Sequence, residues 1–204
     1  MVEVTLPAGF LTKVSQTATD RAHGWDAVAD VLTSPDATLV DRLRSGALAQ
    51  TWRDSTGWLG EDAHVLTAEL MSLDVYARGA SRRTADADLA DLRSGYAALV
   101  ARDAGLVASI RELADLCREE AAAWTDARSD EAKASRVGQQ DFITARLVPA
   151  LPDLGGRLAL EAEASVWRLL GRVMLGLLSA DTGKDFQRAV LGEDRGRRRR
   201  SARG

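Results

Sequence analysis

The chain has 204 residues, of which 46% are hydrophobic, and it carries 27 basic side chains, 30 acidic side chains and one cysteine. This length favours one domain with a sizeable core, with two small helical halves as the alternative. A single cysteine excludes an intramolecular disulfide and a cysteine-rich zinc site. Six of the 27 basic residues are arginines between 195 and 203, which leaves 21 basic against 30 acidic side chains elsewhere. This acidic body argues against a nucleic-acid-binding domain. It suits an arginine-bearing partner, or it simply keeps the protein soluble.

The composition also predicts the fold class. Ala, Leu, Arg, Asp and Glu dominate, and β-branched and aromatic residues are sparse, which favours helices. No window shows the sustained alternation of apolar and polar residues that is typical of a strand. The sequence therefore predicts an all-α, single-domain helical bundle of about seven to nine helices without a sheet.

The first part of the chain is expected to form an arm and two helices. Residues 1–18 lack a clear period and are expected to be a loosely ordered arm. From about 20 to 33, apolar residues recur at helical spacing, with Trp25 among them. Ser34 is expected to cap the second helix, with Pro35 at its first position.

The middle of the chain predicts four further helices. A short third helix carries Trp52, and a fourth, capped by Asp62, ends just before Gly79. A fifth helix is expected over about 84–101 and a sixth over about 104–126. The residues expected to face inward from the sixth helix are Leu106, Ile110, Leu113, Cys117, Ala121 and Trp124.

The last part of the chain predicts two more helices and a tail. A seventh helix is expected over about 129–146, followed by a proline-containing break at 148–152 and a long last helix over about 153–180. The helical domain is thus expected to span residues 19–192. The arginine-rich tail, residues 193–204, is polar and is expected to be disordered.

The most apolar stretch does not have the character of a membrane span. It runs from Val166 to Leu178, and Arg168 and Arg172 interrupt it. The first residues also lack the basic, apolar and small-residue order of a secretory signal. We therefore expect a cytoplasmic protein without stable membrane insertion, and a monomer or a weak dimer.

Motifs of enzyme chemistry are missing from the sequence. His23 and His64 belong to no zinc-binding pattern. Gly183 and Lys184 are followed by Asp185, which lacks the hydroxyl that a phosphate-binding loop supplies to magnesium. The cysteine lies on an apolar helical face, which favours a structural thiol. We expect no catalytic residue, metal or cofactor, and the alternative is an enzyme that uses buried carboxylates.

Three other groups of residues have both a structural and a functional interpretation. Closely spaced carboxylates do not face each other on a helix and are expected on solvated faces. These pairs are Glu119 with Glu120, Glu161 with Glu163, and Asp86 with Asp88. Aromatic residues either pack the core or line a peptide groove. The groove candidates are Trp25, Trp52, Trp58 and Tyr96. The tail arginines either contact nucleic acid or acidic lipid, or form a solvated end.

Several segments together carry a family resemblance. Trp25–Asp36 combines an opening helix with Ser-Pro-Asp, and Asp91–Val100 contains Leu-x-x-x-Tyr-x-x-Leu-Val. Glu112–Trp124 contains Glu-Leu-x-x-Leu-x-x-x-Glu-Ala, and Gln139–Pro152 contains Gln-x-x-Phe-x-x-x-Arg-Leu. Val166–Gly171 fits a long final helix. In this order, over about residues 20–180, the segments resemble the TorD/DmsD/NarJ family of redox-enzyme maturation chaperones.

The resemblance implies a function and a set of binding residues. Such a chaperone binds the catalytic subunit of a molybdenum oxidoreductase, or its twin-arginine leader peptide, and assists cofactor insertion and assembly before export. A receptor for a leader needs an apolar groove and carboxylates for the arginines. By correspondence of motif, Trp25, Tyr96, Leu99 and Val100 are expected to line the groove, and Asp103 is expected to meet a guanidinium group.

The chain also departs from the family pattern. Members of the family carry a proline-rich stretch and an acidic hinge with a histidine after the Tyr-containing segment, whereas this chain passes from Val100 almost directly to Asp103. Arg146 stands where the family has a histidine. Because that region is implicated in partner binding, client recognition is expected to differ or to be lost. The alternative is a helical regulatory or adaptor protein with a different protein partner.

Overall fold

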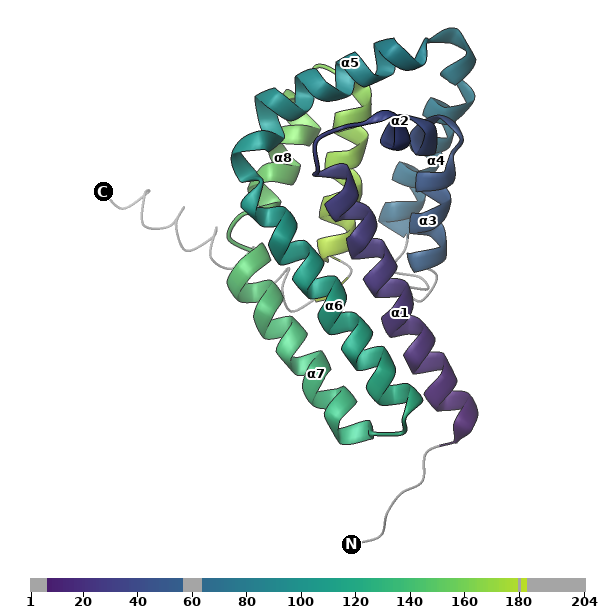
Figure 1. The fold of residues 1–204 in the computed structure, drawn as a ribbon, viewed down its shortest axis with the longest axis vertical. Helices are drawn as coiled ribbons and strands as arrows, with labels where there is room; N and C mark the ends of the chain where they lie inside the picture. The colour runs from purple at the N-terminus through teal and green to yellow at the C-terminus, as the bar shows by residue number, and fades with distance from the viewer. Residues whose placement is uncertain (1–6, 57–63, 180, 183–204) are drawn as a thin grey trace, which may run out of the picture.

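The described part of the chain, residues 7–56, 64–179 and 181–182 of a computed structural model, is built from helices and contains no strand. Its nine α-helices confirm the all-α prediction (Figure 1). They are α1 (Ala8–Val31), α2 (Ala37–Arg44), α3 (Ala47–Thr56), α4 (His64–Arg78), α5 (Ala85–Gly95), α6 (Gly105–Thr125), α7 (Ser129–Phe142), α8 (Leu151–Glu161) and a last helix over residues 165–179. Short turns of other helical types are η2 (Ala80–Arg82), η3 (Tyr96–Val100), η4 (Ala101–Asp103) and η5 (Ile143–Leu147).

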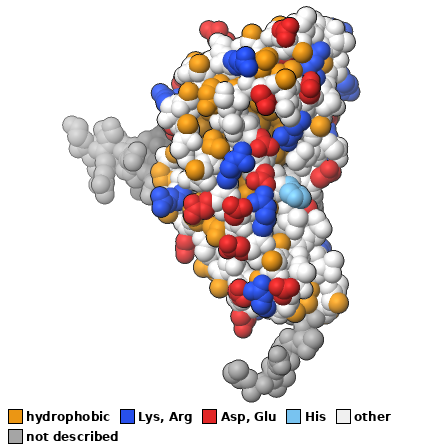
Figure 2. Space-filling view, viewed as in Figure 1, with side chains coloured by type: hydrophobic (Ala, Val, Ile, Leu, Met, Phe, Trp, Pro, Cys, Tyr) orange, Lys and Arg blue, Asp and Glu red, His pale blue; other side chains and the backbone are white. Residues whose placement is uncertain are grey.

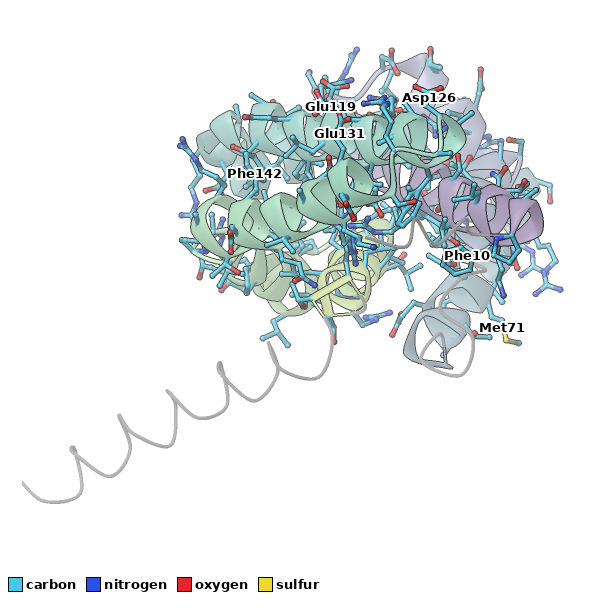
Figure 3. All side chains as sticks on the ribbon, turned by 90° about the horizontal axis from the view of Figure 1, so that it is seen from below. Phe10, Met71, Glu119, Asp126, Glu131 and Phe142 are labelled. Carbon is cyan, nitrogen blue, oxygen red and sulfur yellow. The ribbon has the colours of Figure 1, made fainter. Side chains whose placement is uncertain are left out.

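Three long helices form one layer of the molecule. α1, α6 and α7 lie side by side and alternate in direction, with α6 in the middle (Figure 1). α2 to α5 gather around the end where α1 finishes and α6 begins. The last helix lies behind this layer in Figure 1, and below it in the view of Figure 3. The main core therefore lies between the layer and the other helices.

The first helix begins earlier than the sequence pattern indicates. α1 starts at Ala8, so the prediction of a loosely ordered arm over residues 1–18 is wrong from Ala8 onward. Leu11 and Val14 pack against a small apolar cluster that contains Trp124. These contacts with a distant part of the chain stabilise a segment whose own sequence lacks a clear apolar period.

The second helix has a different cap from the predicted one. Asp36, and not Ser34, is the N-cap: its carboxylate accepts a hydrogen bond from the backbone N–H of Leu39 at 2.9 Å. α2 therefore starts at Ala37, and the predicted cap is wrong. A carboxylate at this position satisfies an unpaired N–H group and also complements the helix dipole.

The core confirms the predicted inward face of α6. All six residues predicted to face inward are buried: Leu106, Ile110, Leu113, Cys117, Ala121 and Trp124. Their spacing places them on one stripe of the helix, which packs between α1 and α7. Local periodicity was therefore sufficient to orient this helix.

The predicted long last helix is interrupted. α8 ends at Glu161, Ala162 is extended, and a new helix begins at residue 165. The two helices cross so closely that a Cβ atom on Gly171 would lie 2.7 Å from the carbonyl oxygen of Gly155. This contact needs two separate helices that turn back on each other, so long-range packing outweighs the helical propensity of the connecting residues.

Two of the predicted helices end in π-helical turns. The predicted helix over about 84–101 consists of α5 followed by η3, and the one over about 129–146 consists of α7 followed by η5. In each turn the backbone N–H of a residue bonds to the carbonyl five residues earlier, as Val148 does to Ile143 at 2.9 Å. Such turns insert one extra residue and are frequent at functional sites.

Some predictions fall outside the described residues. These are the cap at Asp62, the groove candidate Trp58, the first residues of the arm and the tail over 193–204. The expected end of α4 just before Gly79 is confirmed. Within the described ranges, no helix combines the length and apolar composition needed to cross a membrane.

Candidate functional site

A groove of about 430 Å³ opens between the end of α5 with η3 on one side and the end of α8 on the other. Its lining residues are Asp91, Ser94, Gly95, Ala98, Leu99, Glu161, Glu163 and Ala164. Gly95, Ala98, Leu99 and Ala164 provide apolar surface, and the carboxylates lie beside it. The groove therefore offers both apolar contact and negative charge to a ligand.

A close contact between α5 and the last helix positions the first wall. A Cβ atom on Gly95 would lie 2.3 Å from Cδ1 of Trp167, so only glycine fits against this indole ring. The indole Nε1 of Trp167 also donates a hydrogen bond to the carbonyl oxygen of Leu92 at 3.1 Å. Trp167 is fully buried, and it thereby anchors the α5–η3 junction from which Leu99 reaches the groove.

The second wall is held by a side chain of the last helix. Arg168 donates hydrogen bonds to the carbonyl oxygens of Ala162 at 2.6 Å and Glu163 at 2.7 Å. These carbonyls follow the end of α8 and would otherwise depend on solvent for partners. The turn that carries Glu161 and Glu163 is thereby fixed in place, with both carboxylates exposed.

The groove carboxylates share the lack of an ion pair with several other surface carboxylates of the described ranges, such as Glu112, Glu119 and Asp141, but they alone lie around this groove. Within residues 7–56, 64–179 and 181–182, no ion pair involves Asp91, Glu161 or Glu163. On the face drawn in Figure 2, by contrast, acidic and basic side chains are interspersed. Leu160, next to Glu161 in the chain, is 85% exposed. Carboxylates without an ion pair in the described ranges, beside exposed apolar surface, are suited to a cationic, partly apolar ligand.

Two of the five predicted client-binding residues have no surface to offer in this structure. Trp25 is 3% exposed and Val100 is 1% exposed, and both belong to the main core. Trp52, another groove candidate, is also fully buried and donates a hydrogen bond to the carbonyl of Gly24. These residues therefore support the fold in the described conformation and do not contact a ligand.

The other three predicted residues lie near one another along η3 and η4. Leu99 lines the groove, and Tyr96, in the same π-helical turn, is half-buried against the core. Asp103 is half-buried and forms ion pairs with Arg157 and Arg102, so its charge is already compensated. Client contact at these three positions stays a prediction. Leu99 is the best supported of the three residues, because it lines the groove.

Trp25 belongs instead to a buried polar network at the opposite end of the last helix. Arg21 Nε donates to Asp181 Oδ1 at 2.7 Å, and Arg21 Nη2 donates to Asp181 Oδ2 at 2.9 Å. Arg21 also bonds to Glu120 at 3.1 Å and to Gln139 at 2.8 Å. The indole of Trp25 donates to Asp181 at 3.0 Å. The network thus joins α1, α6, α7 and the chain just after the last helix.

Burial and charge act in opposite directions on the groups of this network. Burial alone would lower the pKa of Arg21, but its polar neighbours, with the Asp181 carboxylate first among them, together outweigh burial and raise that pKa. Burial raises the pKa of the neighbouring Cys117 thiol to about 12, although the positive charge of Arg21 opposes the change. Cys117 therefore stays a protonated thiol at neutral pH and is no nucleophile, as its apolar face indicated.

A second buried network surrounds Asp88. Its carboxylate accepts hydrogen bonds from Arg44 at 2.6 Å, Arg83 at 2.7 Å and the hydroxyl of Tyr76 at 3.1 Å. Burial alone would raise the pKa of Asp88, but these hydrogen bonds lower it. Burial and the nearby carboxylate raise the pKa of Tyr76 to about 12. This cluster joins α2, α4 and α5 and is satisfied by its own members.

The sequence pattern predicted the exposure of only some of these carboxylates correctly. Glu120 and Asp88 were predicted on solvated faces and are buried, so that prediction is wrong for both. Glu161 and Glu163 are exposed as predicted, but nothing in their sequence marked them as part of a groove. The residues that flank these acidic pairs in the sequence are similar, so the local sequence does not show which carboxylates are buried.

Neither a metal-binding cluster in the described residues nor a similar protein identifies the function. Among the described residues, no group of three or more His, Cys, Asp or Glu side chains is placed to hold a metal ion. Comparison of the chain with models of protein families, with curated proteins and with solved structures finds no match. The family resemblance therefore rests on the sequence segments alone.

Proposed function

We propose that this protein is a client-binding chaperone and that the groove between α5–η3 and α8 holds a cationic, partly apolar segment of the client. The observation that carries the proposal is the set of three exposed carboxylates without an ion-pair partner in the described residues, beside the apolar surface of Leu99 and Ala164. Carboxylates bind guanidinium groups by charge-assisted hydrogen bonds, and apolar grooves bind apolar segments.

The identity of the client follows from the resemblance to the TorD/DmsD/NarJ family. A twin-arginine leader peptide combines two adjacent arginines with an apolar helix, which are the two features that the groove complements. The client is then the catalytic subunit of a molybdenum oxidoreductase, held in the cytoplasm until cofactor insertion and assembly are complete. No catalytic step is required of the chaperone itself.

A peptide-binding titration tests this proposal. A fluorescent twin-arginine leader peptide is titrated with the wild-type protein and with a groove variant carrying Asp91→Asn, Glu161→Gln and Glu163→Gln. We expect the groove variant to bind at least about tenfold more weakly, equivalent to roughly 1.4 kcal/mol. A leader in which both arginines are replaced by glutamine is expected to lose a similar factor.

A matched control removes three charges elsewhere. Glu112→Gln, Glu119→Gln and Asp141→Asn neutralise exposed carboxylates of α6 and α7 that have no ion-pair partner in the same described ranges. Figure 3 shows Glu119 on the side of the molecule that faces away from the last helix. Equal losses in the groove and control variants, or no binding of the leader by the wild type, would contradict the proposal.

One observation favours an adaptor with a different partner. Between η3 and α6 the chain forms only the short turn η4, so the loop and hinge that the family uses for partner binding have no counterpart in this region. Capture of partners from the native cell separates the two functions. A large molybdoenzyme subunit supports the chaperone, and a different partner that depends on the same groove carboxylates supports the adaptor.

A further inference from the structure

The chain itself contains a segment with the charge that the groove lacks. Arg195, Arg197, Arg198, Arg199, Arg200 and Arg203 lie within nine positions, with no acidic residue among them. The groove presents Asp91, Glu161 and Glu163 without ion-pair partners in the described residues. Charge complementarity of this kind favours association, and guanidinium groups can bind carboxylates in a bidentate geometry.

The arginine segment is attached within reach of the groove. Glu163 and Ala164 line the groove and directly precede the last helix, while Thr182 lies at that helix's other end. A helical rise of roughly 1.5 Å per residue places Thr182 about 26 Å from the groove. The residues from 183 to 195 span up to about 43 Å when extended, at roughly 3.3 Å each. The linker is therefore long enough to return to the groove.

We infer that the arginine-rich segment 195–203 occupies the acidic groove of its own chain and competes there with an external cationic ligand. The inference rests on the proposed function only in taking the groove as a binding surface, and it does not depend on the identity of the client. A segment tethered by a linker of this length has an effective concentration on the order of millimolar. A weak contact is then sufficient to occupy the groove until a tighter ligand displaces it.

Competition of this kind has a functional consequence. Ligands that offer only positive charge meet a groove that the tail already fills, whereas a client with both arginines and an apolar segment also gains contact with Leu99 and Ala164. The tail therefore raises the selectivity of the groove for clients that combine both features. Because the tail contacts are ionic, their strength decreases as salt concentration rises.

Disulfide trapping in the full chain tests where the tail lies. Ser94 lines the groove and is exposed, and Ser201 lies within the arginine segment, so the variant Ser94→Cys, Ser201→Cys places one thiol in each. The native Cys117 is buried and does not interfere. Under mild oxidation at low salt we expect an intramolecular disulfide to form at least about tenfold faster than in the same variant with the six tail arginines changed to glutamine.

A second background carries the three groove substitutions, Asp91→Asn, Glu161→Gln and Glu163→Gln, with the same cysteine pair. Trapping is expected to slow by a similar factor there, and to stay fast with the three control substitutions on α6 and α7. Equal rates in all backgrounds overturn the inference. Disulfides that form only between two chains also overturn it, because the tail then occupies the groove of another copy.

The alternative roles of the tail give different results. If the tail serves nucleic acid or anionic lipid, the wild-type chain binds single-stranded DNA or phosphatidylglycerol vesicles through its arginines while trapping is insensitive to the groove charges, and the inference fails. Failure of the proposed function is recognised separately. A wild-type protein that does not bind the leader peptide but shows charge-dependent trapping refutes the leader-binding function and supports the tail contact.

Discussion

Acidic residues lie in two contrasting environments in this molecule. Asp181, Glu120 and Asp88 are buried, and arginines of the same chain neutralise each of them. Asp91, Glu161 and Glu163 are exposed around the groove, and no described residue forms an ion pair with them. The buried carboxylates therefore stabilise the arrangement of helices, whereas the groove carboxylates keep their charge available for a ligand.

The two environments also differ in energy. Removing one partner of a buried ion pair leaves the other charge uncompensated and costs about 3–5 kcal/mol. Removing an exposed charge changes the free energy of unfolding by no more than about 0.5 kcal/mol. Substitutions at the two places therefore separate effects on the fold from effects on binding.

The largest effect is expected at Arg21. Replacement by methionine removes the buried guanidinium that Asp181, Glu120 and Gln139 share, although Asp181 keeps its bonds to Trp25 and Arg136. It is expected to lower the free energy of unfolding by about 3–5 kcal/mol, as measured by urea denaturation. The matched control is Arg111→Met, which removes a half-exposed partner of Asp30 and is expected to cost less than about 1 kcal/mol. Equal losses in the two variants would show that the buried network adds no particular stability.

The next largest effect on the free energy of unfolding is expected at the contact between Gly95 and Trp167, which positions the first groove wall. Gly95→Ala places a methyl group against the buried indole of Trp167 and is expected to destabilise the protein by about 1–3 kcal/mol in denaturant melts. Gly138→Ala is the control, because a Cβ atom there meets nothing within 4 Å. That change in α7 is expected to stabilise by roughly 0.5–1 kcal/mol. A harmless Gly95→Ala would mean that the indole can move aside.

Asp88 connects stability to pH. Asp88→Asn keeps the shape and an acceptor oxygen but removes the charge between Arg44 and Arg83. Because these two arginines are partly exposed, the change is expected to cost only about 1–3 kcal/mol at pH 7. Because the folded pKa of Asp88 lies below its unfolded value, its contribution is complete above the unfolded pKa and is lost as pH falls through the folded pKa.

The pH dependence supplies its own check. The difference in urea midpoint between wild type and Asp88→Asn is expected to shrink as the pH is lowered into the range where Asp88 becomes protonated. Asp86→Asn removes an exposed charge from the first turn of α5 and is expected to cost less than about 1 kcal/mol. A difference that persists unchanged in acid would show that the charge of Asp88 is not what stabilises α2, α4 and α5.

The smallest effect on stability is expected at the groove. Neutralising Asp91, Glu161 and Glu163 together removes no ion pair of the described structure, and the free energy of unfolding is expected to change by less than about 0.5 kcal/mol per site. Thermal melts of this variant beside the Arg21→Met variant complete the comparison. A large loss of stability would show that these carboxylates belong to the folding machinery and would undermine their assignment to a ligand.

Helical structure is the part of this protein that the sequence by itself determined. The stripe from Leu106 to Trp124 oriented α6 correctly, and Gly79 marked the end of α4, because helical periodicity and helix ends depend on residues only a few positions apart. The family resemblance drew attention to the segment with Leu99, which lines the groove, but the same motif correspondence also selected the buried Trp25 and Val100.

Only the tertiary structure decided which carboxylates are buried and where the groove lies. Glu120 and Glu161 occupy similar local sequences, yet one meets Arg21 from 99 residues away and the other stays in solvent. The interruption after Glu161 likewise depends on the close crossing at Gly155 and Gly171. Ion pairing and close helix packing join residues that are distant in the chain, so no local pattern contains them.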